Sequence, residues 1–151
     1  MLRTMMHAKL HRGRVTETRL DYVGSITIDR QLLEEAGILE NERVQVLNLM
    51  TGERMETYTI AGEPGSGVIG INGAAARRFQ VGDQVIIIAY GLFDEEEARR
   101  LRPRVLILDD ENRVVRRVET GAPAVAPMGT DETGRPAPAR PVDRAGSIAE
   151  T

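Results

Sequence analysis

The chain has 151 residues, a length that suffices for one domain with its own core. Its formal net charge is -3 at pH 7. It contains no cysteine, so disulfides, thiolate metal ligands and a cysteine nucleophile are excluded. The charge gives no general attraction for nucleic acid or an anionic membrane, and no apolar run approaches the ~20 residues of a membrane helix. We therefore expect a cytoplasmic protein that binds neither nucleic acid nor membrane.

Residues 1–118 have the pattern of short β-strands joined by turns and small helices. The segments are rich in Val, Ile, Thr and Tyr and are separated by Gly, Asn, Asp or Pro. Their spacing is typical of a small closed barrel. The strands are predicted at residues 2–10, 14–20, 25–29, 43–50, 54–61, 67–71 and 84–91.

Two short helices are predicted in the same region. Residues 29–38 start with Asp29, a good capping residue, and Gly37 is a signal for a helix end. Residues 94–103 place acids in the first turn and arginines in the last, and they end at Pro103, as the helix dipole favours. We expect both helices to be structural.

The composition changes at about Glu119. Five of the seven prolines follow this residue, and there is little apolar surface to bury. The sequence therefore predicts a catalytic or binding domain at 1–118 and a disordered Pro/Ala/Gly-rich tail at 119–151.

A Gly-Ser pair, Gly24-Ser25, opens the predicted strand at 25–29. A serine hydroxyl can attack the carbonyl of the preceding residue and turn the amide into an ester, in an unusual backbone geometry that glycine tolerates. β-Elimination of the ester would cut the chain and leave dehydroalanine, which hydrolyses to a pyruvoyl group with loss of ammonia. A bulge or turn explains the same pair without chemistry.

The predicted strand at 54–61 carries a second set of candidates. Alternation places Arg54 and Tyr58 on one face and Thr57 on the other. A guanidinium can hold a carboxylate through two hydrogen bonds, and a neutral phenol can donate a proton. A solvated or half-buried strand face is the alternative interpretation.

The segment "GINGAAARR" is a candidate anion site. Asn72-Gly73 has the pattern of a turn, and the alanines after it favour the start of a helix. The backbone N–H groups of Gly73, Ala74 and Ala75 would then be free to hold an anion. A plain turn would explain the same residues.

Lys9 is the one lysine among twenty basic residues, and it shares a predicted strand face with His11. Nucleotide bias explains the excess of arginine, but a site that needs a compact ammonium would also retain this lysine. The two histidines, His7 and His11, have no evident carboxylate partner at a zinc-site spacing, so we expect no metal.

In order and spacing, these segments resemble the pyruvoyl-dependent aspartate decarboxylase family. The resemblance extends from Met1 to about Pro103 and rests on "MLRTMMHAKLHRGRVT", "DYVGSITID", "AGILENERVQVLN", "GERMETYTI", "INGAAA" and "VGDQVIII". It implies a mainly-β fold, namely a small six-stranded double-psi β-barrel with short helices. It also implies a homotetramer with active sites between neighbouring subunits.

The resemblance implies self-cleavage between Gly24 and Ser25. A β-chain (1–24) and an α-chain starting at residue 25 would result, with Ser25 converted to a covalent pyruvoyl cofactor in place of pyridoxal phosphate or a metal. The implied reaction is that of a carboxy-lyase, which converts L-aspartate to β-alanine and carbon dioxide through a Schiff base and supplies pantothenate and coenzyme A. The sequence leaves open whether cleavage is spontaneous or needs a maturation factor.

The resemblance also implies roles for individual residues. Ser25 would form the Schiff base, and Tyr58 would be the proton donor. The implied substrate-binding residues are Lys9, Arg54, Thr57, Gly73, Ala74 and Ala75, and the implied supporting residues of the pocket are His11, Tyr22 and Asn72.

Two questions stay open at this level. Alternation separates Thr57 from Arg54 and Tyr58, although the resemblance implies one site; a bulge, backbone contacts or a site between two subunits would reconcile them. The alternative function is a non-catalytic double-psi barrel that binds a ligand or another protein.

Overall fold

The computed structural model describes residues 1–118, which form nine strands, two α-helices and one 3-10 helix. The predicted tail at 119–151 lies outside the described residues. In chain order the elements are β1 (Arg3–Arg14), β2 (Glu17–Arg19), β3 (Ser25–Asp29), α1 (Arg30–Ala36), β4 (Arg43–Asn48), β5 (Arg54–Gly62), β6 (Ile69–Asn72), η1 (Gly73–Arg78), β7 (Gln84–Phe93), α2 (Glu95–Arg100), β8 (Arg104–Leu108) and β9 (Val114–Val118).

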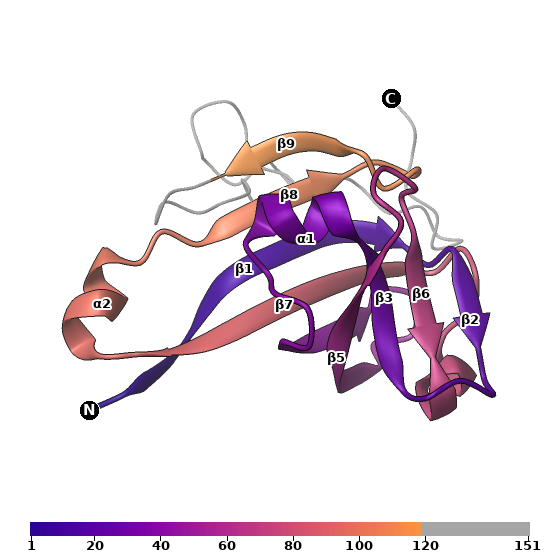
Figure 1. Cartoon of the computed structure of the whole chain (residues 1–151), viewed down its shortest axis with the longest axis horizontal. Coiled ribbons are helices and arrows are strands. Elements are labelled where there is room, and N and C mark those ends of the chain that lie inside the picture. Colours follow the sequence, from indigo (N-terminus) through magenta and orange to yellow (C-terminus); the bar gives the residue numbers. More distant parts are fainter. Residues whose placement is uncertain (119–151) are drawn as a thin grey trace, which may run out of the picture. The chain divides into compact units, whose positions relative to one another are not determined.

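The strands pair in the order β2-β6-β3-β5-β4-β7-β1-β8-β9. Figure 1 shows β1 and β7 side by side as two long antiparallel strands, with α2 at one end and β3, β6 and β2 toward the other. The expected mainly-β fold with short helices is confirmed. The strand count differs from the expected six, because residues 1–118 also form the hairpin of β8 and β9 and the very short β2, which lies within the strand predicted at 14–20.

The hairpin of β8 and β9 extends the sheet beyond the segments predicted as strands, which ended at residue 91. β8 runs parallel to β1, and β9 runs antiparallel to β8. Val105, Leu106 and Leu108 are buried. β8 therefore pairs the edge of β1, which would otherwise present unpaired backbone groups to water.

The first predicted strand is longer than expected, and its pairing with β7 shifts at two places, the first between Met6 and Ala8. β1 continues to Arg14, and its pairing with β7 shifts between Leu10 and Gly13. Arg12 has a φ of 63° at this point. The extra residue bends β1, as bulges do where a small barrel turns a corner.

Both predicted helices are confirmed, with the expected caps. The Asp29 carboxylate accepts a hydrogen bond from the Gln31 N–H, and Gly37 ends α1 in the left-handed conformation with a φ of 71°. Asp94 caps α2 through a reciprocal pair of hydrogen bonds with Glu97. Asp29 is also buried and accepts hydrogen bonds from backbone N–H groups of the loop before β6, so one carboxylate fixes two segments.

The sheet has a buried apolar face and a more polar face. The buried face carries aliphatic side chains from six strands, for example Leu10, Ile26, Val44, Ile71 and Ile87. Neighbouring residues alternate to the other face, and on β1 buried Ala8 and Leu10 flank the partly buried Lys9. The predicted aliphatic core thus leaves the other face of the sheet free for polar side chains.

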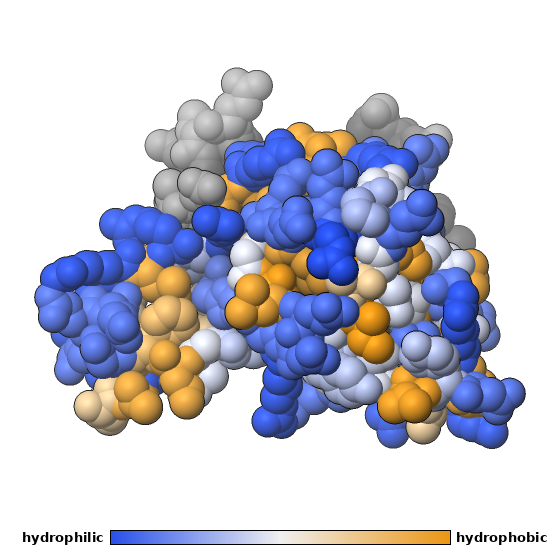
Figure 2. Space-filling model, viewed as in Figure 1, coloured by the Kyte–Doolittle hydropathy of each residue, from blue (hydrophilic) through white to orange (hydrophobic). Residues whose placement is uncertain are grey.

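Figure 2 shows hydrophobic side chains in several separate groups between polar ones on the visible face of the molecule. One group lies at the end where β1 begins and β7 finishes, next to α2. Met1, Leu2 and Leu92 are exposed in these segments. The two strand ends therefore extend beyond the part of the sheet that covers the core.

A single buried side chain, that of Asn112, joins three segments of the barrel. Its Nδ2 donates to the carbonyl oxygens of Arg14 and Gly67, at 2.8 and 2.7 Å. Its Oδ1 accepts from the Arg14 N–H at 2.7 Å. The residue has a φ of 60°, which asparagine adopts more readily than most residues. Asn112 therefore fixes the turn between β8 and β9 against the end of β1.

We predict that Asn112→Ala destabilises the protein more than Asn41→Ala. Asn41 also has a positive φ, of 68°, but its side chain is exposed and has no hydrogen bond within residues 1–118. Both changes share the backbone strain, so the difference between them reports the lost hydrogen bonds, at about 2 kcal/mol. Urea unfolding of the two variants measures it, and equal losses would contradict this role of Asn112.

Candidate active site

Ser25 is held from the neighbouring strand by Asn72. The two residues are paired in the antiparallel register of β3 and β6. The Asn72 Nδ2 donates to Ser25 Oγ at 2.8 Å and to Thr27 Oγ1 at 3.0 Å. Ser25 and Asn72 are both buried. A buried amide thus orients the hydroxyl next to the predicted cleavage site.

Tyr58 is brought to Ser25 from the opposite side. β3 and β5 are parallel, with Ile26 paired to Thr59. Carrying this register back by one residue places Ser25 beside Tyr58 on the same face of the sheet. The tyrosine is partly buried, and its hydroxyl has no hydrogen bond within residues 1–118. The order of strands β6-β3-β5 therefore brings Asn72, Ser25 and Tyr58 into one row.

Thr57 lies on the opposite face of β5, as alternation predicted. The pairing of β4 with β5 runs from Arg43 opposite Tyr58 to Leu47 opposite Arg54, and it has no register shift. Thr57 is opposite Val44, a residue of the core. A bulge between residues 54 and 58 therefore cannot bring its side chain to the face of Tyr58. Backbone contacts or a second subunit remain as explanations.

Lys9 and Arg54 lie on the polar face of the sheet, but on strands that are not neighbours. β7 and β4 lie between β1, which carries Lys9, and β5, which carries Arg54. Lys9 has no carboxylate partner in the described part of the chain, and the contact of Arg54 there is with Gln45, at 3.5 Å. Both cations are therefore available to an anionic ligand. A single chain does not place Lys9 on a strand next to Ser25.

Comparison with known proteins identifies the family of the chain. A model of the family described as aspartate decarboxylase matches residues 1–115. The chain belongs to the aspartate decarboxylase family. The match continues past Pro103, the point at which the resemblance was expected to fade.

The curated relatives match this chain over most of their own length. Two proteins named aspartate 1-decarboxylase are 61% identical over 114 residues (Exiguobacterium sibiricum; 76% of this chain and 90% of the relative) and 57% identical over 116 residues (Carboxydothermus hydrogenoformans; 77% and 91%). Among solved structures, the rationally designed mkDPBB_sym_86 protein is a weaker match, with a TM-score of 0.40, 18% identity and coverage of 56% of this chain and 92% of that chain.

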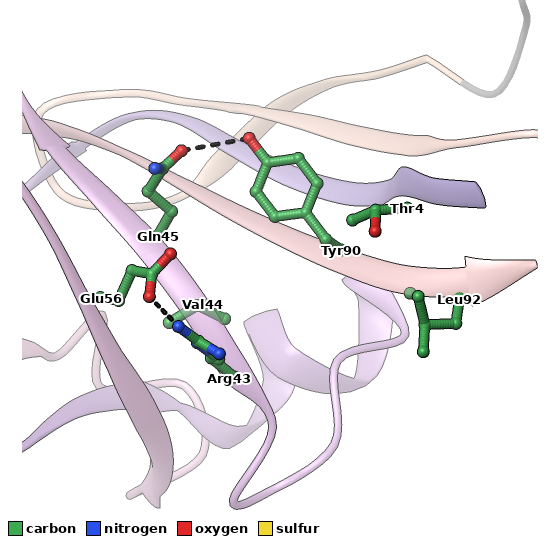
Figure 3. Close-up of a pocket in the computed structure, with 8 residues that line it drawn as sticks. Thr4, Arg43, Val44, Gln45, Glu56, Tyr90 and Leu92 are labelled. Atoms are coloured by element: carbon green, nitrogen blue, oxygen red, sulfur yellow. Dashed lines mark hydrogen bonds and ion pairs between the residues drawn. The ribbon is translucent and has the colours of Figure 1, made fainter. Parts of the chain in front are cut away.

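A pocket of about 430 Å³ lies on the polar face between β4, β5 and β7. Figure 3 shows the Tyr90 hydroxyl directed at the Gln45 amide and Arg43 paired with Glu56. The Gln45 Oε1 accepts from Tyr90 at 3.1 Å and from Arg54 at 3.5 Å. Gln45 and Tyr90 could not be predicted from the sequence, because they meet near Arg54 only through the pairing of β4 with β5 and β7.

His11 has an environment that disfavours its charged form. Its Nδ1 is buried without a hydrogen-bond partner in the described residues. Burial, then the positive charges of Lys9 and Arg12, lower the pKa of its imidazole below the usual 6.5. The predicted proximity of Lys9 and His11 is consistent with this influence. A neutral His11 with a free nitrogen is available to accept a hydrogen bond at neutral pH.

The remaining candidates surround the start of β3. Gly73 follows the last residue of β6 and lies against the segment before Ser25. It opens η1, a 3-10 helix, where the start of a helix was predicted. Asn72 has extended backbone and not the predicted turn geometry. Ala74 is exposed and Ala75 partly buried in η1. Tyr22 is 49% exposed, in the segment that leads to the Gly-Ser pair.

His7 has a carboxylate partner that its sequence neighbours did not suggest. Its Nε2 lies 2.9 Å from Glu42 Oε2, between residues 35 positions apart. Within residues 1–118, no group of three or more His, Asp or Glu side chains is arranged to hold a metal ion. Nor does that part of the chain contain a helix long and apolar enough to cross a membrane.

We predict that His11→Asn flattens the dependence of stability on pH. The unfolded histidine binds protons below about pH 6.5, whereas the folded one resists them, so stability falls as pH drops through this value toward the lowered pKa. Scanning calorimetry between pH 7.5 and about pH 5 measures this in both proteins. An equally steep loss in the variant would contradict the assigned environment of His11.

Proposed function

We propose that this chain is a self-processing carboxy-lyase that converts L-aspartate to β-alanine and carbon dioxide. The observation that carries the proposal is the row formed by Asn72, Ser25 and Tyr58 in a member of the aspartate decarboxylase family. Production of β-alanine for pantothenate and coenzyme A, in the cytoplasm, is the corresponding cellular role.

Self-cleavage would begin at Ser25. Its Oγ attacks the Gly24 carbonyl carbon, the carbon–oxygen bond forms, and the Gly24–Ser25 carbon–nitrogen bond breaks as the proton passes to nitrogen. Loss of the Ser25 Cα proton and cleavage of its Cβ–Oγ bond then release Gly24 as a carboxylate. Water converts the remaining dehydroalanine to pyruvoyl and ammonia. The hydrogen bond from Asn72 holds the attacking oxygen in place before this step.

The residues around Ser25 fit a pyruvoyl group. The Asn72 amide is a buried donor directed at Ser25 Oγ, and once this oxygen has left with Gly24 the amide would be free to donate to the ketone oxygen. When formed, the group supplies a carbonyl that condenses with the substrate amine and draws off the electrons left by carbon dioxide. No metal or pyridoxal phosphate is needed for this chemistry.

The cations would bind the substrate, and the tyrosine would protonate it. Lys9 and Arg54 would bind the two carboxylates, since neither has a carboxylate partner in the described part of the chain. Tyr58 would give its hydroxyl proton to the carbon that loses carbon dioxide. The backbone of Gly73, Ala74 and Ala75 would hold the substrate from η1, with Thr57, His11 and Tyr22 as further contacts.

A homotetramer would complete the site. Lys9 and Arg54 lie on strands that are not neighbours, and the Thr57 side chain faces away from Tyr58. A second subunit can supply to each Ser25 the groups that its own chain places elsewhere. A maturation factor, if required, would act on cleavage before this site becomes active.

We predict that Ser25→Ala abolishes cleavage and decarboxylation together, because no hydroxyl remains to attack Gly24. Denaturing intact-mass spectrometry and a β-alanine assay measure the two losses. Turnover of aspartate at the wild-type rate by this variant would refute the mechanism. It would show that the Gly-Ser pair is only a bend and that the decarboxylating group comes from another residue.

We predict that Tyr58→Phe is cleaved normally but decarboxylates aspartate at least about 100-fold more slowly, because the proton donor is lost. The mass spectrum of the variant serves as its own control for folding and maturation. Wild-type kcat in fully cleaved Tyr58→Phe would remove this residue from the role of proton donor.

A further inference from the structure

Gly73 lies directly against the segment that the proposed function cuts. It has a φ of +73°, at the junction of β6 and η1. A Cβ at this position would lie 2.7 Å from Gly24 Cα, 2.9 Å from Gly24 N and 3.0 Å from the Tyr22 carbonyl oxygen. Real Cβ atoms essentially never approach heavy atoms as closely as the two distances to Gly24, and the third contact is also tight. A side chain at position 73 therefore requires residues 22–24 to move.

All three neighbours are backbone atoms, which makes this contact different from most others at glycines. A side chain in the way can change its rotamer, but a backbone atom moves only with its segment. At Gly13, for example, the nearest atom to an added Cβ is the end of the Ile69 side chain. Gly73 thus constrains the path of the chain itself.

Gly24 does not carry this constraint. It lacks a positive φ, and a Cβ added there would meet no atom within 4 Å. The uncut chain therefore needs no glycine at position 24 for a left-handed backbone or for space. Instead, the steric requirement for glycine lies on the neighbouring strand, at position 73.

We infer that Gly73 is a positioning residue for self-cleavage; this inference rests on the proposed function. Two consecutive residues would then fix the two reacting groups: Asn72 holds the Ser25 hydroxyl by a 2.8 Å hydrogen bond, and Gly73 sets where Gly24 lies. Attack requires the oxygen to approach the Gly24 carbonyl carbon to about 3–3.5 Å in the right direction. A displacement of Gly24 relative to Ser25 acts directly on that approach.

The test compares the rate of cleavage in Gly73→Ala and Gly52→Ala. Gly52 is the matched control, since its φ of +77° imposes the same strain on alanine while an added Cβ meets nothing within 4 Å. Freshly made protein is sampled over time by denaturing intact-mass spectrometry, with melting temperatures for each chain. We expect Gly73→Ala to be cleaved at least tenfold more slowly than wild type, and Gly52→Ala to match wild type.

The outcomes separate the two levels of the proposal. Wild-type protein that stays uncut and still releases β-alanine from aspartate overturns the proposed function and this inference with it. A cut wild type with equally fast cleavage of Gly73→Ala overturns the inference alone. Slow cleavage in both variants, with equal losses in melting temperature, would assign the effect to backbone strain and also overturn it.

A second measurement covers the case in which Gly73→Ala does not fold. In uncleavable Ser25→Ala labelled with ¹³C-glycine, the α-protons of Gly73 and Gly24 are expected to show a nuclear Overhauser effect in solution. Its absence in folded protein would overturn the inference without any change at position 73.

Discussion

The account depends on the strand register that places Ser25 between Asn72 and Tyr58. β3 pairs with β6 on one side and β5 on the other, and a slip of one residue in either pairing would turn its partner to the opposite face. The register is set by Ile26 and Ile28, which are fully buried on the other face. The aliphatic core of a chain with few aromatic residues thus determines which polar groups meet.

The same face pattern is the reason that we propose a site completed by a second subunit. Lys9, Ser25, Arg54 and Tyr58 lie on the polar face, but the sheet distributes them over strands β1, β3 and β5. Closing the distance within one chain would break pairings that bury the core. Association of subunits, as proposed, would bring such groups together while leaving the sheet intact. Within residues 1–118 Lys9 and Arg54 have no carboxylate partner, which suits the dianionic substrate of the proposed function.

Helix caps and strand faces could be predicted from the sequence, whereas contacts between residues far apart in the chain could not. The caps Asp29 and Gly37, and the opposite faces of Thr57 and Tyr58, follow from signals within a few residues. The role of Asn112 depends on hydrogen bonds to residues 98 and 45 positions away, which no local pattern reveals. The hairpin of β8 and β9 was missed for a related reason, since its burial depends on the edge of β1.

The catalytic candidates show the same division. The Gly-Ser pair and the Arg54–Tyr58 spacing were visible, although each alone had an ordinary structural explanation. Gln45 and the steric role of Gly73 required the register of neighbouring strands. The structure requires a glycine for steric reasons at position 73 and not at position 24. The reason is the close approach of Gly73 to the Gly24 backbone, which joins two segments far apart in the sequence.

The most direct test of the central claim is the denaturing intact mass of the purified wild-type protein. The account predicts two chains split after Gly24, with the larger one lighter by one ammonia than a chain that starts with serine. A single uncut chain in a preparation that releases β-alanine from aspartate would contradict it, because activity would then arise without the group that Ser25 is proposed to supply.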